Sequence, residues 1–299
     1  MNGKILIVDD EKIIRGMLQA ELEDYYEVTT AVNAEEALEI CKTATFDLVI
    51  SDINMPGMKG YDLLGEIKKL YPRTKVSLIT AYNIDDYVRM AKQHGISNII
   101  PKTTPFNFDE LNTLVKGLVS EDIFGIERHM HEGYEIVAVY EMKESADIER
   151  VENDIMKKVT AFFREEMSLR ILLEETLSNA VYHAPVTADG KEKYIKHSKI
   201  TLEPSEYVDV KLVKDDEKYG VAVVDKSGHL TKDIVLYKID RNIMAEGLLD
   251  ENGRGLHMSR MYSDRFMINI KPKVKTEVIM LNYFTDKYKG YKPLYITEL

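Results

Sequence analysis

Five polar residues in the first third of the chain have types and positions suited to phosphoryl chemistry. Each follows an apolar, strand-like run, and they are Asp9, Asp10, Asp52, Thr80 and Lys102. Three carboxylates in one place repel one another unless a cation lies among them, and Mg²⁺ prefers such oxygen ligands. A lysine and a hydroxyl suit the oxygens of a phosphoryl group, and one carboxylate can accept that group as a nucleophile. Ordinary turn formation explains any one of these acidic residues, but it does not explain the whole set.

A second set of polar residues lies on one predicted helix. Glu175, Asn179 and His183 are spaced four apart within "LLEETLSNAVYHA", residues 172–184. Residues four apart share a face of an α-helix, so these three form a polar stripe beside an apolar one. One interpretation is the solvated face of an ordinary amphipathic helix. The other is a site for a metal ion and a nucleotide.

Two later segments favour the nucleotide interpretation. "VVDKSGHL" places Asp225 at the end of an apolar run, and "NGRGLHM" places Gly253 and Gly255 before a predicted helix. Glycines that open a helix let backbone N–H groups approach a phosphate closely, and a helix N-terminus favours anions. With the Glu/Asn helix, in this order along the chain, they indicate a nucleotide site in the second half.

The elements that position the first set alternate between strand and helix. Strand-like runs occur at "KILIVDD", "EVTTA", "FDLVISD", "VSLITA" and "SNIIPK", with helical patterns at 11–24, 34–43, 58–70, 84–94 and 108–119. This alternation predicts an α/β, doubly wound sheet of five parallel strands. In such a sheet the ligand crevice lies beyond the carboxyl ends of the strands, where the five polar residues fall.

After residue 134 the pattern predicts a second, α+β domain. Strands are predicted at "YEIVAVYEMK", "IKHSKITLE", "YVDVKLVKD", "KYGVAVVD", "RFMINIKPK" and "TEVIMLNYF", and helices at 148–165, 167–183 and "GLHMSRMYS". Strands grouped apart from helices predict a two-layer sandwich. The stretch 226–252 has no regular pattern, and we expect it to form a lid.

The predicted organisation is therefore a first domain over 1–120, a connector over 121–133 and a second domain over 134–299. The connector carries His129 and His131, which we expect on the solvated surface.

Composition restricts the classes of partner. The 299 residues carry a net charge of −11, which disfavours direct binding to nucleic acid. No apolar run approaches the roughly 20 residues needed to cross a bilayer, the N-terminus lacks the pattern of a secretory leader, and Cys41 is the single cysteine. We expect a cytoplasmic protein with no disulfide and no membrane association.

The first domain resembles the receiver domain of two-component response regulators. The motifs are "VDD" (8–10), "SDINMPGMKG" (51–60), "TA" (80–81) and "PK" (101–102). The resemblance implies a flavodoxin-like fold with Asp52 as phosphoacceptor. It also implies Mg²⁺ held by Asp9, Asp10, Asp52 and the backbone carbonyl of Asn54, with Thr80 and Lys102 bound to the phosphoryl oxygens. The phosphodonor would be a cognate histidine kinase or a phosphotransfer protein.

Two positions depart from the common receiver pattern. Many receivers carry an aromatic residue three positions before the lysine, where this chain has Ile99, and the proline that usually follows the lysine is delayed to Pro105. The usual aromatic switch is therefore absent, and we expect the signal to leave through backbone shifts around 82–106 and the connector.

The second domain resembles the ATP-binding fold shared by gyrase, histidine kinases and anti-sigma-factor serine kinases, the GHKL or Bergerat type. "EETLSNAVYHA" brings it closest to the anti-sigma kinases. The resemblance implies Mg²⁺ on Asn179, Glu175 as general base and Asp225 on the adenine amino group. The residues implied for nucleotide binding are Asn179, His183, Asp225, Gly228, Gly253, Arg254 and Gly255.

The aspartate box departs from that family. The family pattern is Asp-x-Gly-x-Gly, whereas this chain has Asp225-Lys226-Ser227-Gly228-His229. If the loop needs positive φ at both family glycine positions, Ser227 and His229 are penalised there, and His229 would crowd the base pocket.

Two functions from different classes follow. One is a response regulator whose output domain binds ATP and acts as a protein-serine kinase. The other has an output domain without ATP turnover, which only captures a sigma factor or an anti-sigma antagonist. Receiver pairing into a homodimer is a further possibility, whereas a sensor histidine kinase would need a helical histidine hairpin that this sequence lacks.

Overall fold

The computed structural model describes residues 3–162, 166–244, 246 and 255–299. The chain forms two compact units. Unit 1 comprises Met1–Ile123 and Tyr288–Tyr295, and unit 2 comprises Phe124–Lys287 and Ile296–Leu299. Among the described residues, no helix combines the length and the apolar character needed to cross a membrane.

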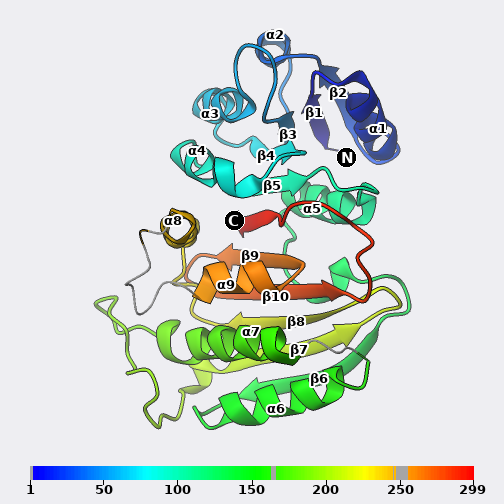
Figure 1. Ribbon diagram of the computed structural model, residues 1–299. Helices are drawn as coiled ribbons and strands as arrows, with labels where there is room; N and C mark the ends of the chain where they lie inside the picture. Colours follow the sequence, from blue (N-terminus) through cyan, green and yellow to red (C-terminus); the bar gives the residue numbers. More distant parts are fainter. Residues whose placement is uncertain (1–2, 163–165, 245, 247–254) are drawn as a thin grey trace. The chain divides into compact units, whose positions relative to one another are not determined.

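Unit 1 contains the predicted sheet of five parallel strands, in the order β2-β1-β3-β4-β5. The strands are β1 (Lys4–Val8), β2 (Glu27–Ala31), β3 (Leu48–Asp52), β4 (Lys75–Thr80) and β5 (Asn98–Pro101). The helices are α1 (Lys12–Leu22), α2 (Ala34–Thr43), α3 (Gly60–Leu70), η1 (Ile84–Tyr87), α4 (Val88–Gln93) and α5 (Phe108–Ser120). Helices α1 and α5 lie on one face of the sheet, and α2, α3 and α4 on the other (Figure 1).

The sequence explains these elements locally. Strands β3, β4 and β5 are almost wholly buried, as expected for parallel strands covered by helices on both faces. Two asparagines begin helices, because the side chain of Asn33 accepts a hydrogen bond from Glu36 N and that of Asn107 from Glu110 N.

The C-terminal part of the chain adds a strand to unit 1 that the sequence did not predict. Strand β11 (Leu294–Glu298) begins there, and Leu294 and Tyr295 pair antiparallel with Ile99 and Asn98 of β5. Leu294 is 1% exposed and Tyr295 is 4% exposed. The predicted division at 120 and 134 therefore misses a segment of the second domain's sequence that packs with the first.

Unit 2 is built on five antiparallel strands in the order β9-β10-β8-β7-β6. They are β6 (Glu135–Met142), β7 (Val208–Lys214), β8 (Lys218–Asp225), β9 (Arg265–Lys271) and β10 (Lys275–Tyr283). The helices are η2 (Ile126–His129), α6 (Asp147–Val159), α7 (Glu166–Ser178), the π-helical turn η3 (Asn179–His183), η4 (Pro204–Glu206), α8 (Lys232–Ile243) and α9 (Gly255–Tyr262). Helices α6, α7 and α9 lie across one face of the sheet (Figure 1).

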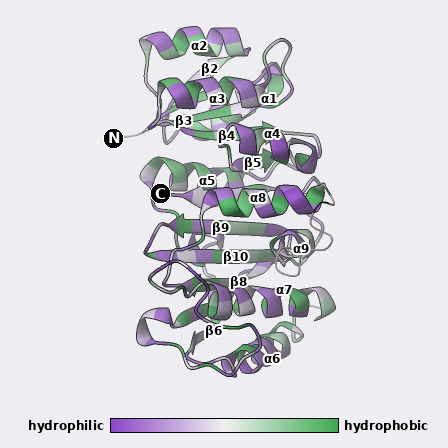
Figure 2. Ribbon diagram, turned by 90° about the vertical axis from the view of Figure 1, so that its left-hand side faces the viewer, coloured by the Kyte–Doolittle hydropathy of each residue, from purple (hydrophilic) through white to green (hydrophobic). Residues whose placement is uncertain are grey.

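Hydropathy explains which faces meet. Figure 2 shows apolar residues concentrated along strands β9 and β10, while helix α8 has both polar and apolar sectors. Helices with one apolar side bury that side against the sheet and leave charged residues outside. The predicted α+β layering of the second half is present in this mixed unit of mostly antiparallel strands.

Two local predictions for unit 2 were wrong. Residues 195–203 form no strand, because His197 adopts a left-handed φ of +67° and Thr201 makes only an isolated bridge to Glu144. The stretch 226–252 contains helix α8, which begins where the side chain of Thr231 accepts a hydrogen bond from Ile234 N. Polar residues of helix α8 interrupt the apolar repeat, so the sequence pattern did not indicate a helix.

Most of the predicted connector packs as part of unit 2. Ile126 is buried, and Gly125 N donates to both carboxylate oxygens of Glu277 at 3.0 Å. His131 Nδ1 lies 2.9 Å from Asp216 Oδ1, and His129 is partly buried. The prediction of two solvated histidines is therefore corrected, because residues 124–133 cover the sheet.

Candidate functional site

The first predicted site is assembled at the carboxyl ends of the parallel strands of unit 1. Asp9 directly follows β1, Asp52 ends β3, Thr80 ends β4 and Lys102 directly follows β5. The strands are parallel and in register, so these residues reach the same edge of the sheet. Asp9, Asp52 and Thr80 are at most 6% exposed, whereas Asp10 is exposed.

Lys102 is the centre of this site. Its Nζ lies 2.6 Å from Asp52 Oδ1 and 3.0 Å from Asp9 Oδ2, and the Lys102 side chain is 7% exposed. Burial lowers the pKa of Lys102, but the hydrogen bonds and charges of Asp52 and Asp9 outweigh it, so the pKa is raised overall. The ammonium therefore stays charged beside the acceptor carboxylate.

The acidic residues offer a donor set that suits Mg²⁺. Burial raises the pKa of Asp9, an effect that Lys102 partly opposes. Asp52 Oδ2 accepts a hydrogen bond from Asn54 N at 2.6 Å, which holds the carbonyl-bearing loop close to the acceptor. Buried carboxylates beside an exposed Asp10 form an oxygen-rich cluster of the kind that hard divalent cations prefer.

Sequence reasoning missed three residues that support the site. Glu11 Oε1 lies 3.2 Å from Lys102 Nζ, and Arg15 Nη1 donates to the backbone oxygen of Asp9 at 2.6 Å. The Tyr87 hydroxyl accepts a hydrogen bond of 2.6 Å from Asn54 Nδ2. Glu11 adjoins the acidic pair in sequence and could have been suspected, but nothing in the spacing of Tyr87 signals this contact.

Buried carboxylates, a threonine and a lysine at the ends of a five-stranded parallel sheet define the class of receiver domains. The chain belongs to the response regulator receiver family. Residues 5–116 match the response regulator receiver domain. Sporulation initiation phosphotransferase F of Bacillus subtilis is 36% identical over 117 residues, which are 93% of that protein and 39% of this chain.

Other relatives share the same part of the chain. DNA-binding transcriptional regulator NtrC of Escherichia coli is 38% identical over 119 residues, which are 40% of this chain, so the chain spans about a quarter (25%) of that protein's length. Among solved structures, response regulator protein TrrA of Thermotoga maritima in complex with Mg²⁺-BeF is 44% identical, with a TM-score of 0.36, and the match covers 39% of this chain and 98% of that one.

A second candidate site is a cavity of about 320 Å³ in unit 2. Its volume is at the lower end of the range for small-molecule pockets. The cavity is lined by four residues predicted for nucleotide binding, Asn179, His183, Asp225 and Gly255, and by Glu175, which was predicted as the general base. Apolar side chains form much of the remaining wall, including Ala180, Val223, Leu230, Phe266 and Val278.

Asp225 already has hydrogen-bond partners within its own loop. Its Oδ1 accepts hydrogen bonds from Ser227 N at 3.0 Å, from Ser227 Oγ and from Gly228 N at 3.3 Å. Burial raises the pKa of Asp225, while these hydrogen bonds oppose the rise. Oδ2 takes part in none of the three bonds.

In the aspartate box, the residue with positive φ is Gly228, one position away from each of the two family glycine positions. Gly228 has a φ of +59°, whereas Ser227 and His229 do not adopt positive φ. A Cβ on Gly228 would lie 2.5 Å from Val274 N and 2.6 Å from Lys271 O. The expected penalty on Ser227 and His229 is therefore absent, although His229 does line the cavity.

The polar stripe of Glu175, Asn179 and His183 does not lie on one continuous α-helix. After Ser178 the chain forms the π-helical turn η3, closed by Ala184 N donating to Asn179 O at 3.0 Å. π-helical turns are rare and often occur at functional sites. His183 Nδ1 lies 2.8 Å from Glu192 Oε1.

Glu175 is held by three neighbours. Asn179 Nδ2 donates to its Oε1 at 3.0 Å, and Lys196 Nζ lies 3.7 Å from its Oε2. Gly255 packs so closely that a Cβ there would lie 1.8 Å from Glu175 Oε1. A side chain at position 255 would therefore displace the carboxylate of Glu175 from its present position. Gly253 and Arg254, also predicted for this site, lie outside the described residues.

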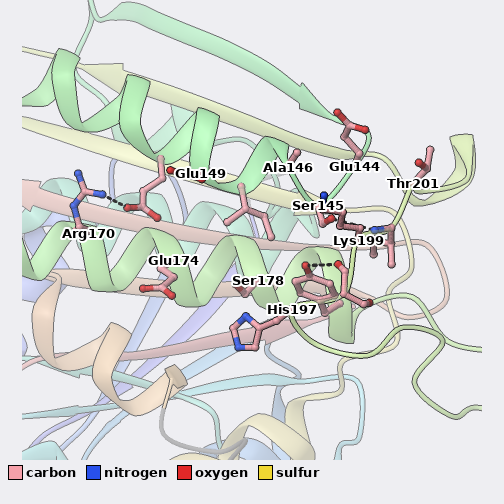
Figure 3. A pocket seen from close by; sticks show the side chains of 15 residues that line it. Glu144, Ser145, Ala146, Glu149, Arg170, Glu174, Ser178, His197, Lys199 and Thr201 are labelled. Atoms are coloured by element: carbon pink, nitrogen blue, oxygen red, sulfur yellow. Dashed lines mark hydrogen bonds and ion pairs between the residues drawn. The ribbon is translucent and has the colours of Figure 1, made fainter.

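A larger cavity of about 740 Å³ lies between α6, α7 and residues 197–201 (Figure 3). Four glutamates line it, namely Glu144, Glu149, Glu152 and Glu174. Arg170 Nη1 forms an ion pair with Glu152, and the other three carboxylates are exposed. Lys199 also lines this cavity, and none of the residues predicted for nucleotide binding does. The smaller cavity, which four of those residues line, is therefore the better candidate for a nucleotide.

Proposed function

We propose that this protein is a response regulator in which phosphorylation of Asp52 controls unit 2. The observation that supports it most strongly is the buried contact of Lys102 Nζ with Asp52 Oδ1 at 2.6 Å, within a domain of the receiver family. A lysine that stays charged beside one carboxylate is placed to neutralise a phosphoryl group formed there.

The chemistry is the attack of an Asp52 carboxylate oxygen on the phosphorus of a donor, with the leaving group departing on the opposite side. The donor is a cognate histidine kinase or a phosphotransfer protein. Bound Mg²⁺ would be held by Asp9, Asp10, Asp52 and the carbonyl of Asn54, and would offset the negative charge of the phosphoryl oxygens. Lys102 supplies a second positive charge beside Asp52, and Thr80 offers a hydroxyl donor.

The test is phosphorylation of the full chain by acetyl phosphate with Mg²⁺, followed by intact-mass measurement. We expect one added phosphoryl group in the parent and none in Asp52→Asn. Asp24→Asn removes an exposed carboxylate of the same unit and serves as the matched control. Undiminished labelling of Asp52→Asn would exclude this residue as the acceptor.

We further propose that unit 2 binds ATP in the cavity formed by Glu175, Asn179 and Asp225. Asn179 donates through its amide nitrogen to Glu175, which leaves its amide oxygen on the other side of the group for a metal ion. Apolar walls from Val223 and Phe266 suit a planar base. If the cavity turns over ATP, Glu175 is the base toward a serine hydroxyl, and unit 2 is a protein-serine kinase.

Titration of the full chain with ATP, with and without Mg²⁺, tests this site. Asn179→Ala should remove the Mg²⁺-dependent part of the affinity, and Asp225→Asn should reduce the preference for ATP over GTP. Lys191→Ala, an exposed change in the neighbouring loop, should leave both unchanged. Equal affinity of the parent for ATP and GTP would contradict the adenine role of Asp225.

The hydrogen bonds of Asp225 favour a second candidate function. Its Oδ1 is engaged by Ser227 and Gly228, and Glu175 is engaged by Asn179 and Lys196. A nucleotide would have to replace or share these contacts. In this alternative, unit 2 captures a sigma factor or an anti-sigma antagonist without ATP turnover. Absence of ATP binding at millimolar concentration would favour it.

A further inference from the structure

Residues Tyr288–Tyr295 form part of unit 1, although they lie about 170 residues beyond the end of the receiver sequence. They contact the residues that directly follow Lys102. Thr104 N donates to Lys289 O at 2.8 Å, and Lys289 N donates to Thr104 O at 3.3 Å. We call Tyr288–Tyr295 the C-terminal strap.

The strap is held at three places along the receiver. Gly290 packs on Thr103 so closely that a Cβ would lie 3.0 Å from its Cγ2. Leu294 pairs with Ile99, and the Tyr295 hydroxyl donates to Glu110 Oε1 of α5 at 2.6 Å. The contacts therefore extend over the loop after β5, β5 itself and α5.

This attachment lies next to the phosphorylation site along the backbone. Lys102 N donates to Thr80 O at 2.7 Å while Lys102 Nζ contacts Asp52. Phosphorylation converts a carboxylate of charge −1 to a group of about −2 and adds three oxygens. Lys102 and Thr80 must rearrange to bind those oxygens, and Thr103 and Thr104 directly follow Lys102 in the chain.

We propose that phosphorylation of Asp52 loosens the C-terminal strap from the receiver, and that the strap carries the signal toward unit 2. This inference rests on phosphorylation at Asp52. Gly290 lies against Thr103, and the next residue, Thr104, pairs with Lys289 through two backbone hydrogen bonds. A loop shift therefore weakens the paired hydrogen bonds between Thr104 and Lys289.

The residues that follow the strap connect it to unit 2. Strand β11 continues from Tyr295 to residues that belong to unit 2. In unit 2, Leu299 N donates to Ile270 O at 3.0 Å, and Glu298 accepts a hydrogen bond from Lys232 N at 2.8 Å. Lys232 begins helix α8, which contributes side chains to the 320 Å³ cavity. The strap is thus a covalent route from the receiver to that helix.

Hydrogen exchange on the full chain tests the first half of the proposal. Mg²⁺ with beryllofluoride, an analogue of the phosphoryl group, is compared with Mg²⁺ alone. We expect faster exchange of the amides of Thr104 and Lys289 with beryllofluoride, together with slower exchange around Asp52. Asp52→Asn should show neither change.

Coupling is reciprocal, so weakening the strap should strengthen binding of the analogue. Tyr295→Phe removes one hydrogen bond, which corresponds to an increase of about two- to tenfold in beryllofluoride affinity. Tyr291→Phe is the matched control, because Tyr291 lies in the same segment with 46% exposure, and its affinity should equal that of the parent.

The outcomes separate the two proposals. In one outcome, beryllofluoride slows exchange around Asp52 but leaves Lys289 and Thr104 unchanged, and Tyr295→Phe binds beryllofluoride as the parent does. The strap is then not coupled to the phosphorylation site, and this inference is wrong. If nothing changes around Asp52 either, phosphorylation at that residue fails first, and the coupling fails with it. Slower exchange of the strap would reverse the proposed direction and also contradict it.

Discussion

At the scale of single residues, the cost of replacing a glycine depends on its backbone conformation and on the atoms that surround it. Gly228 and Gly133 both have positive φ, of +59° and +86°. A Cβ on Gly228 would meet the backbone of Lys271 and Val274, whereas nothing lies within 4 Å of one on Gly133. The two glycines therefore allow the cost of left-handed backbone to be separated from the cost of a clash.

We predict that Gly133→Ala lowers the free energy of unfolding by about 1–2 kcal/mol, the cost of left-handed backbone, and that Gly228→Ala lowers it by more. The clash at Gly228 is with backbone atoms, which cannot rotate away as a side chain can. Urea unfolding followed by circular dichroism measures both. Equal losses would show that the loop after Asp225 shifts freely to accept a methyl group.

Tyr87 offers a second prediction at this scale. Its hydroxyl accepts a hydrogen bond from Asn54 Nδ2, and Asn54 N donates to Asp52 Oδ2. Tyr87→Phe frees the loop that follows the acceptor, so we expect a change of about two- to tenfold in the rate of phosphorylation by acetyl phosphate. Tyr82→Phe, at an exposed tyrosine of the same segment, is the control and should keep the parental rate.

At the scale of elements, short irregular helices determine which residues meet. The π-helical turn η3 lets the chain leave helix α7 with Asn179 and His183 both lining the cavity. The 3₁₀ turn η2 places the partly buried His129 near the charges of Arg128 and Lys218. Neither element follows from a simple apolar period.

His129 makes the stability of unit 2 depend on pH. Burial, followed by the charges of Arg128 and Lys218, lowers the pKa of His129 to about 3 from its ordinary value of 6.5. Between these values the unfolded chain binds a proton that the folded chain excludes. The contribution to stability is therefore complete above pH 6.5 and is lost as pH falls, by at most about 1.4 kcal/mol per pH unit.

We predict that His129→Gln reduces this pH dependence between pH 6.5 and 4.5, because glutamine takes up no proton. Urea unfolding at several pH values measures the difference between the two proteins. The same slope in parent and variant would mean that His129 is protonated as readily in the folded chain as in the unfolded one.

At the scale of the whole molecule, the division into units does not follow the order of the chain. The backbone passes between units after Ile123, after Lys287 and after Tyr295. β5 has β4 on one side and takes Leu294 and Tyr295 on the other. An uncovered edge strand is a ready template for pairing with another chain.

A chain ending at Lys287 should therefore expose the free edge of β5. We predict lower stability of unit 1, because the apolar contacts of Leu294 and Tyr295 are lost, and a concentration-dependent rise in self-association. Sedimentation velocity of the truncated and full chains at matched concentrations measures this. A truncated chain that stays as monomeric as the full chain would show that the edge has other protection.

For the first 116 residues, the sequence was enough to predict the parallel sheet and the polar residues at its carboxyl edge. Apolar runs that alternate with helical patterns end at or just before Asp9, Asp52, Thr80 and Lys102, and the carboxyl ends of parallel strands meet at one edge of their sheet. Strand and helix periods also predicted the five paired strands of unit 2 and helices α6, α7 and α9. These features are local, because each depends on neighbours a few residues apart.

Tertiary structure alone decided the rest. The C-terminal strap joins β5 across a separation of nearly 200 residues, and only the shape of the assembled receiver edge selects it. Gly228, and neither Ser227 nor His229, has a positive φ in the loop after Asp225. The turn near Val274 also leaves no room there for a Cβ. Gly255 lies against the side chain of Glu175, which comes from a different helix. Such contacts depend on which surfaces come together, and no local period in the sequence records them.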